Sequence, residues 1–346
     1  MSAAHVVIRA DGGSRLGIGH LRRCAVLAGT LQKDGYVVEF VRRRDDDDPN
    51  PPAVEGFPTR WIAAAETDGV YSQHADAAAT IAAVGRASGR RCWAVVDHYQ
   101  LDSLWEADLR AAGYAVIAID DFRHRPHASD ILVSDCPIPF RHDPLTAQPP
   151  RQLVGFAFAL IEPAFAFAGP TEPPAAARIL VTYGGSDPGG QTLRASAALQ
   201  RLRRIRDDIG AVDLVIGPAN RLRAEIEDGA AQAGFTTHVA PTTLAPLMRS
   251  ADVVMTAGGN TMAEALSLRK ACLVTVTADN QRLIVDALVA RDQVVEAAPD
   301  MQAMTATLAT LLDSRVSRSR WLQTTPCVDH LGAQRIAGVM RELEAS

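Results

Sequence analysis

The sequence has no apolar run long enough to cross a membrane, because no stretch approaches the roughly 20 consecutive apolar residues that a spanning helix needs. A signal peptide is not indicated either, since Arg9 and Asp11 interrupt the first apolar stretch. The five cysteines are scattered, odd in number and without a Cys-x-x-Cys pair, which argues against a disulfide framework or a zinc site. We therefore expect a cytoplasmic protein with buried, reduced thiols and no membrane span.

An excess of basic residues is also missing. The chain has 35 lysines and arginines against 40 aspartates and glutamates, which gives a formal net charge of −5. A general nucleic-acid-binding protein carries a net basic face, so we expect a small-molecule partner and no nucleic acid. We expect the chain to be a monomer or a weak dimer.

The acidic and histidine-containing stretches do not predict a metal site. The four aspartates at 45–48 are followed by prolines, and consecutive carboxylates point in different directions, which favours a solvated loop. His124 and His127 are separated by Pro126, which breaks the helix that would align the two imidazoles as ligands. We expect no bound metal and no cofactor.

The length and the pattern of the chain predict two α/β domains. At 346 residues it exceeds the size at which a single core usually stops growing. Short apolar runs alternate with helical segments, and after a proline-rich stretch at 137–174 the pattern restarts at 178–182. We predict two doubly wound, Rossmann-like domains at 1–166 and 177–346, joined by a linker at 167–176. In the first domain, strands are expected at 5–8, 36–41, 93–97, 116–119 and 131–133, with helices at 75–87 and 104–112.

The stretch from Ile8 to Cys24 is the first candidate for chemistry. It reads as a strand, a glycine-rich loop that contains Gly17 and Gly19, and a helix that begins near His20. An ordinary imidazole pKa of about 6.5 would leave His20 mostly neutral at pH 7 and able to accept a proton. Its charged neighbours include Arg9, Asp11 and Arg23. The alternative is a polar residue that only caps the turn.

Polar side chains also follow two of the predicted strands. Asp97, His98 and Tyr99 come at the end of the strand at 93–97, and Asp120 and Asp121 follow the strand at 116–119. Ligands of open parallel sheets bind at the carboxyl ends of the strands, so these residues are candidate contacts. Each of the first three could instead be a buried polar group that is bonded to the backbone.

The second half contains two glycine-rich loops at the ends of predicted strands. Gly185, Ser186 and Asp187 belong to the first loop, which is either an anion cradle or a tight turn. In the second loop Gly258, Gly259, Asn260 and Thr261 precede a helix, whose N-terminal amides and dipole suit a diphosphate. Simple capping of the helix is the alternative role for Asn260 and Thr261.

The same half contains two further groups of polar residues. Glu264, one turn into the helix, could accept two ribose hydroxyls or complete a capping box. Asp279, Asn280 and Gln281 follow the next strand and suit sugar hydroxyls or amides.

Taken together, these motifs resemble one enzyme family. They are Arg9–Asp11 with Gly17–Arg23, Val96–Tyr99, Asp120–Asp121 with Arg125–His127, Gly184–Pro188, and Ala257–Leu266 with Ala278–Gln281. The chain resembles the hydrolases that remove UDP from UDP-2,4-diacetamido-2,4,6-trideoxy-β-L-altropyranose in pseudaminic acid biosynthesis. That family is related to the peptidoglycan N-acetylglucosaminyltransferase. The chain departs from the family's usual pattern at 161–165, 269–271 and 329–330.

The resemblance implies a GT-B-like fold, with two domains facing a central cleft, and a metal-independent, inverting attack of water on a UDP-sugar. The implied catalytic histidine is His20, with Tyr99 and Asn280 near the sugar, the 258–261 loop on the diphosphate and Glu264 on the ribose. Asp11 is a further catalytic candidate. The remaining candidate substrate-binding residues are Arg9, Gly17, Gly19, Arg23, Asp97, His98, Gly185, Ser186, Asp187, Asp279 and Gln281. The alternatives are a GT-B glycosyltransferase with a soluble acceptor and a non-catalytic sugar-nucleotide-binding protein.

Overall fold

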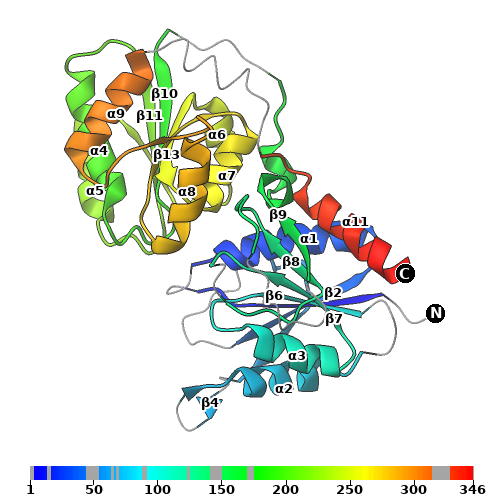
Figure 1. Cartoon of the computed structure of the whole chain (residues 1–346). Helices are drawn as coiled ribbons and strands as arrows, with labels where there is room; N and C mark the ends of the chain where they lie inside the picture. Colours follow the sequence, from blue (N-terminus) through cyan, green and yellow to red (C-terminus); the bar gives the residue numbers. More distant parts are fainter. Residues whose placement is uncertain are drawn as a thin grey trace. The chain divides into compact units, whose positions relative to one another are not determined.

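The computed structural model describes residues 4–13, 17–43, 54–63, 66–67, 70–87, 92–122, 125–140, 150–169, 175–313 and 328–345. The aspartate run at 45–48, His124 and Cys327 lie outside these ranges. The chain folds into two compact units (Figure 1). Unit 1 consists of Met1–Leu160 with Leu331–Ser346, and unit 2 consists of Ile161–His330.

Unit 1 is built on a seven-stranded parallel sheet in the order β3-β2-β1-β6-β7-β8-β9. Its central strands are continuous apolar runs, as expected for strands that are covered on both faces. The strands are β1 (His5–Ala10), β2 (Val37–Arg43), β3 (Thr59–Ile62), β6 (Cys92–Asp97), β7 (Ala115–Ile119), β8 (Ile131–Ser134) and β9 (Arg151–Val154). A small antiparallel hairpin pairs β4 (Glu66–Thr67) with β5 (Val70–Tyr71).

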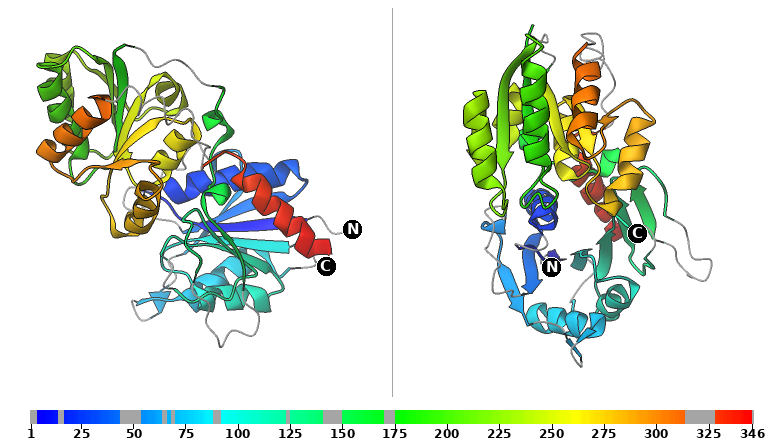
Figure 2. Two further views of the ribbon diagram at one scale, coloured as in Figure 1. Left: turned by 45° about the horizontal axis from the view of Figure 1, so that its top comes forward. Right: turned by 90° about the vertical axis from the view of Figure 1, so that its left-hand side faces the viewer.

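Helices cover both faces of this sheet (Figure 2). Alternate residues of β1 face opposite sides, so Val6 and Ile8 pack in a core with α1 (Gly19–Lys33) and α11 (Gly332–Ala345), while Val7 packs in the core of the other face. That second core includes Trp105 and Leu109 of α3 (Ser103–Ala111), which lies beside α2 (Gln73–Val84).

The last helix corrects the domain boundaries expected from sequence. We expected 177–346 to form the C-terminal domain, but α11 belongs to unit 1. The helix is amphipathic, and Ile336 and Met340 are fully buried in the unit 1 core against α1. Gly332 lies so close to Ala159 that a Cβ at this position would meet the Ala159 carbonyl at 2.1 Å. The boundary between the units accordingly falls at Leu160, before the expected linker at 167–176, of which 170–174 lie outside the described residues.

Unit 2 is built on a six-stranded parallel sheet in the order β12-β11-β10-β13-β14-β15. Its strands are β10 (Ala177–Thr182), β11 (Ile209–Ile216), β12 (Thr236–Val239), β13 (Val253–Ala257), β14 (Ala271–Thr275) and β15 (Val295–Glu296). Its helices are α4 (Gln191–Arg203), α5 (Arg223–Ala233), α6 (Ala245–Ser250), α7 (Asn260–Ser267), α8 (Arg282–Val289) and α9 (Met301–Asp313). In Figure 1, α4, α5 and α9 lie on one side of the strands, and α6, α7 and α8 lie on the other.

The predicted fold class of two doubly wound parallel α/β domains is therefore confirmed. Cys24, Cys92, Cys136 and Cys272 are buried thiols, as expected. Among the described residues, no helix is both long and apolar enough to span a membrane.

Candidate active site

The carboxyl edge of the unit 1 sheet brings His20 and Asp97 together. His20 lies in the first turn of α1 and is buried, and Asp97 is the last residue of β6. The His20 Nδ1 atom lies 2.6 Å from the Asp97 Oδ1 atom. Since the carboxylate can only accept, we assign the proton to Nδ1, and the Nε2 atom then carries the lone pair. This arrangement suits a general base.

Arg23 holds the same carboxylate from the next turn of α1. Its Nε and Nη2 atoms each donate to Asp97 at 2.6 Å, and its Nη1 atom donates to both oxygens of Asp121 at 3.0 and 3.1 Å. Burial by itself would raise the pKa of Asp97, but the Arg23 guanidinium and the His20 imidazole hold it well below its usual range. Asp97 therefore stays ionised and orients the imidazole. Both Asp97 oxygens are bonded to neighbouring side chains, whereas the sequence had suggested a contact with the ligand.

Tyr99 forms an aromatic wall beside His20. The two ring centroids are 4.4 Å apart at an interplanar angle of 79°, and Phe122 packs on the Tyr99 ring at 4.9 Å. The Tyr99 residue is 39% exposed, so part of it faces solvent at the mouth of this cluster. Burial of its remainder raises the pKa of Tyr99 to about 12, so the hydroxyl stays protonated at neutral pH and can donate a hydrogen bond.

A second cluster, centred on Arg9, takes up three of the residues that were expected to contact substrate or act in catalysis. The fully buried Arg9 donates to Asp11 at 2.6 and 2.9 Å and to Asp76 of α2 at 2.9 and 2.7 Å. Both nitrogens of His98 are engaged, Nε2 with Asp11 at 3.1 Å and Nδ1 with the Gln100 N–H at 3.1 Å. The structure thus places Arg9, Asp11 and His98 in a structural network beneath the loops.

The glycine loop before α1 is closed by its own backbone. Gly13 and Gly17 exchange two hydrogen bonds of 3.0 and 2.8 Å, and Gly17 has a positive φ of 73°. A Cβ on Gly12 would lie 2.6 Å from the Leu21 Cδ1 atom, so the loop packs tightly on the start of the helix. Gly17 and Gly19 are exposed at this turn, where they set the position of His20.

A third ionic cluster was missed by the sequence analysis. His127 lies between two carboxylates, with Nδ1 2.7 Å from Glu106 and Nε2 3.2 Å from Asp120, and Arg125 also binds Asp120. Arg125 donates further to the carbonyls of His98 and Leu101 at 2.8 and 3.0 Å, which ties the loop that contains Tyr99 to the segment after β7. Asp120 and Arg125–His127 were included in one sequence motif and His127 was considered as a metal ligand, but this cluster was not predicted.

The His127 cluster predicts a pH-dependent stability. Burial would lower the pKa of His127, but its bonds to Asp120 and Glu106 raise it to about 9. Because the folded-state pKa lies above the unfolded value of about 6.5, this stabilisation is complete below pH 6.5 and is lost as the pH rises toward 9. We expect the free energy of unfolding to fall by on the order of 3 kcal/mol across this interval, measured by urea denaturation. His127→Gln should show a flatter profile, and an equally steep profile in this variant would contradict the assignment.

In unit 2, the loop between β13 and α7 is held against the start of α8. The Gln281 Oε1 atom accepts hydrogen bonds from the Gly258 N–H at 3.2 Å and from the N–H and hydroxyl of Thr277 at 3.0 and 3.2 Å. A Cβ on Gly258 would lie 2.5 Å from the Val285 Cγ2 atom, so only glycine allows this approach. Gln281 therefore fixes the loop, whereas we had expected its amide to contact a sugar.

The other residues of this edge are placed as follows. Gly259 is exposed, and α7 begins directly after it with Asn260 and Thr261, both half-buried. Glu264 is buried one turn further along the same helix. Asp279 is exposed and Asn280 is half-buried, in a short 3-10 helix, η4 (Asp279–Gln281), that leads into α8.

The loop after β10 is organised by its aspartate. The two Asp187 oxygens accept hydrogen bonds from the Gln191 and Thr192 N–H groups, each at 2.8 Å. These are the first amides of α4, so the carboxylate satisfies the groups that an anion would have needed. Gly185 and Ser186 are exposed on the outer side of the loop. Asp187 therefore caps the helix, as expected if this loop is a tight turn and not an anion cradle.

Within the described part of the chain, no group of three or more histidine, cysteine, aspartate or glutamate side chains is placed to hold a metal ion.

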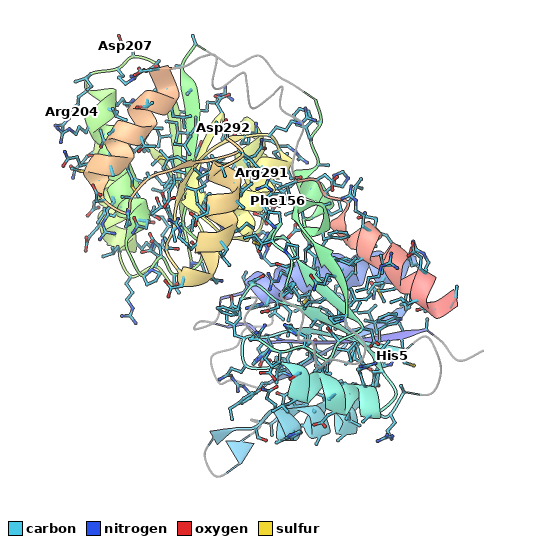
Figure 3. The ribbon with its side chains drawn as sticks, in the orientation of Figure 1. His5, Phe156, Arg204, Asp207, Arg291 and Asp292 are labelled. Atoms are coloured by element: carbon cyan, nitrogen blue, oxygen red, sulfur yellow. The ribbon has the colours of Figure 1, made fainter. Side chains whose placement is uncertain are left out.

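His5 shows the contrast between the two ends of the unit 1 sheet. It lies at the amino end of β1 (Figure 3), and its Nε2 atom contacts Glu39 at 2.8 Å. The His20 cluster, in contrast, gathers at the carboxyl ends of the strands, where ligands of such sheets bind.

Solved structures match this chain along nearly its whole length. The crystal structure of Acinetobacter baumannii MurG has a TM-score of 0.67 at 13% identity and covers 98% of this chain and 99% of its own. The S. aureus MnaA–UDP co-structure has a TM-score of 0.66 at 10% identity, covering 98% of this chain and 96% of its own. The chain has a GT-B-like fold.

A third match is the spinosyn rhamnosyltransferase SpnG complexed with thymidine diphosphate, with a TM-score of 0.59 at 17% identity over 97% of this chain and 99% of its own. No protein-family model and no curated sequence matches the chain. Identities this low show a shared fold and leave the activity to be argued from the site.

Proposed function

We propose that this protein is a nucleotide-sugar hydrolase, which releases UDP from a UDP-linked diacetamido-trideoxy sugar. The observation that carries the proposal is the His20–Asp97 pair, because its geometry leaves an imidazole nitrogen ready to accept a proton. The nature of the sugar comes from the motifs around His20, Tyr99 and Asn280 that resemble the pseudaminic acid pathway hydrolases.

In the proposed reaction a water molecule attacks the anomeric carbon. The His20 Nε2 atom takes one proton from this water while the new carbon–oxygen bond forms. The bond between the anomeric carbon and the diphosphate oxygen breaks, and UDP leaves with the electron pair. Attack on the face opposite the leaving group inverts the configuration. Asp97 stabilises the imidazolium that forms, in the way a buried carboxylate supports the histidine of a catalytic triad.

The nucleotide is assigned to unit 2. The start of α7, directly after Gly258 and Gly259, supplies backbone amides and the positive end of a helix dipole for the diphosphate. These groups stabilise the leaving diphosphate electrostatically, so we propose a reaction that needs no metal. Asn260 and Thr261 belong to this diphosphate site, and Glu264 is assigned to the ribose.

The titles of the structural neighbours support a nucleotide-sugar substrate. One neighbour is a co-structure with UDP and another is complexed with thymidine diphosphate. A third is the UDP-GlcNAc 2-epimerase from Neisseria meningitidis bound to UDP-GlcNAc, with a TM-score of 0.58 at 11% identity over 98% of this chain and 100% of its own. These neighbours include both transferases and epimerases, so the reaction itself must be tested.

The contacts revise the roles expected for several residues. In the proposal His20 is the base, while Tyr99 and Asn280 contact the sugar, with Asp279 beside them. Gly185 and Ser186 remain candidate contacts to the substrate. Residues whose side chains form hydrogen bonds with other parts of the protein become positioning residues, namely Arg9, Asp11, Arg23, Asp97, His98, Asp187 and Gln281.

The deciding experiment measures UDP release from a UDP-linked 2,4-diacetamido-2,4,6-trideoxy sugar by the purified protein. We expect release in the absence of any acceptor, an inverted sugar product by NMR, and an unchanged rate in the presence of EDTA. Release that requires an added sugar acceptor would instead establish a glycosyltransferase. Binding of the UDP-sugar without any release would contradict both enzymatic functions.

A further inference from the structure

The carboxylate that orients His20 is shared with a cation. Asp97 accepts two hydrogen bonds from Arg23, each of 2.6 Å, besides the one from His20. The Cys24 Sγ atom is the third side-chain group on this carboxylate, at 3.6 Å. The Arg23 Nη2 atom also lies 3.4 Å from the His20 Nδ1 atom, so the guanidinium is next to the imidazole, although its bonds to the acid are shorter. All of these side chains are buried or nearly so.

This sharing has an electrostatic consequence. A carboxylate next to a histidine favours the imidazolium and raises the histidine pKa, commonly by one to several units for a buried pair. A base that is already protonated at neutral pH cannot accept a proton from water. A positive charge within about 4–6 Å acts in the opposite direction, because it disfavours a second cation. Arg23 is placed to offset the effect of Asp97 on His20.

Asp121 is the other half of this arrangement. Both of its oxygens accept from the Arg23 Nη1 atom, on the side of the guanidinium away from Asp97. The segment after β7 thus fixes the position of Arg23 and partly neutralises it. Among the described residues, the Tyr99 ring, from the loop after β6, packs on His20, and the Cys24 thiol, from α1, contacts Asp97.

We propose that Arg23, held by Asp121, is a positioning residue that opposes protonation of His20 while Asp97 keeps the imidazole oriented. This inference rests on the proposed role of His20 as the base. It assigns to Arg23 a function other than the substrate contact that its position in the sequence suggested. The Arg23–Asp121 pair is then a device that sets the lower pH limit of the reaction.

The test is a pair of variants with opposite expected effects. In Arg23→Gln the guanidinium charge is lost, and we expect the His20 pKa to rise by about one to three units. In Asp121→Asn a negative charge is lost next to Arg23, and we expect the His20 pKa to fall. The His20 titration is followed by NMR of the imidazole in the intact protein, with ¹³C- or ¹⁵N-labelled histidine and the signal assigned through His20→Gln.

Arg23→Lys is the matched control, because it retains the charge and is expected to move the His20 pKa less than Arg23→Gln does. The acid limb of kcat/KM against pH should shift in the same direction as the NMR titration in each variant. A role for Arg23 that is only structural would lower the rate without moving this limb.

The NMR titration does not depend on turnover, so it tests the role of Arg23 even if the protein is not a hydrolase. If Arg23→Gln does not fold, Asp121→Asn and Arg23→Lys carry the test. A His20 pKa that is the same in all folded variants, or that moves in one direction in both charge-changing variants, would overturn the proposal.

Discussion

Replacement of His20 by glutamine is expected to lower kcat by about 10²–10⁴-fold, the usual contribution of a positioned general base. Glutamine can still donate a hydrogen bond to Asp97, but it cannot take a proton from water. Because the diphosphate site is assigned to unit 2, the affinity for UDP should stay nearly unchanged. The measurements are initial rates of UDP release and calorimetric titration with UDP.

The chain contains a close control for this experiment. His74 and Asp108 form another histidine–aspartate pair with the same 2.6 Å separation, but the His74 side chain is 65% exposed. His74→Gln should leave kcat within about a factor of two of the unmodified protein, because an exposed ion pair contributes little. If His20→Gln also lost UDP affinity in parallel with turnover, its assignment as the base would be wrong.

The strands and helices that the sequence predicted well are those with long apolar runs. The strand expected at 93–97 is β6 (Cys92–Asp97), and the strand expected at 178–182 is β10 (Ala177–Thr182). Both are buried between layers, so their side chains are apolar almost throughout. Periodicity and composition carry most of the information in such segments.

The elements that were missed are short, lie at an edge, or follow polar residues. β9 (Arg151–Val154) is an edge strand at the end of a proline-rich stretch, and the Gln152 amide is bonded to the Phe140 backbone. β15 (Val295–Glu296) has only two residues. The helix α8 (Arg282–Val289) directly follows the polar residues 279–281, where no helix was expected. Their structure depends on neighbours that are distant in the sequence.

The residues of the candidate site also divide into those that the sequence predicted and those that it did not. The sequence located the residues at the strand ends, Asp97 and Tyr99 among them, and it singled out His20 at the start of the helix that follows the glycine-rich loop. It did not distinguish a side chain that faces a ligand from one that is hydrogen-bonded to another side chain, because the bonded partners are far apart in the sequence. Arg23 and Asp121 are separated by 98 positions. Only the packing of α1 against the ends of β6 and β7 brings such charges together.

Asp76 is the clearest example of a residue that sequence patterns could not identify. It lies within the alanine-rich helix α2 (Gln73–Val84), where a single acidic residue predicts nothing beyond an exposed position. In the structure it is fully buried. Besides Arg9, 67 positions away, it accepts hydrogen bonds from the Tyr71 hydroxyl at 2.7 Å and from the Trp105 Nε1 atom at 3.0 Å. One hint was present in the sequence: Asp76 lies on the same face of the helix as the alanines, and this is the face that the helix is expected to bury.

The largest loss of stability is expected from Asp76→Ala. The substitution removes one of the two carboxylates on the buried Arg9 guanidinium and leaves three neutral donors, on Tyr71, Trp105 and Thr80, without this acceptor. Loss of one partner from a buried ion pair costs about 3–5 kcal/mol, because the remaining charge cannot return to water. We expect the free energy of unfolding, measured by urea denaturation, to fall by about this amount.

Asp108→Ala is the control for Asp76→Ala, since it removes a carboxylate from an exposed pair on neighbouring α3 and should change stability by less than about 1 kcal/mol.

Comparison of stability with kcat in Asp76→Ala also tests the role given to Asp11. If Asp11 binds Arg9 and His98 only to hold the strand ends in place, loss of Asp76 should lower stability much more than it lowers kcat at temperatures where the variant is folded. A variant as stable as the unmodified protein but without turnover would mean that the Arg9 cluster takes a direct part in the reaction.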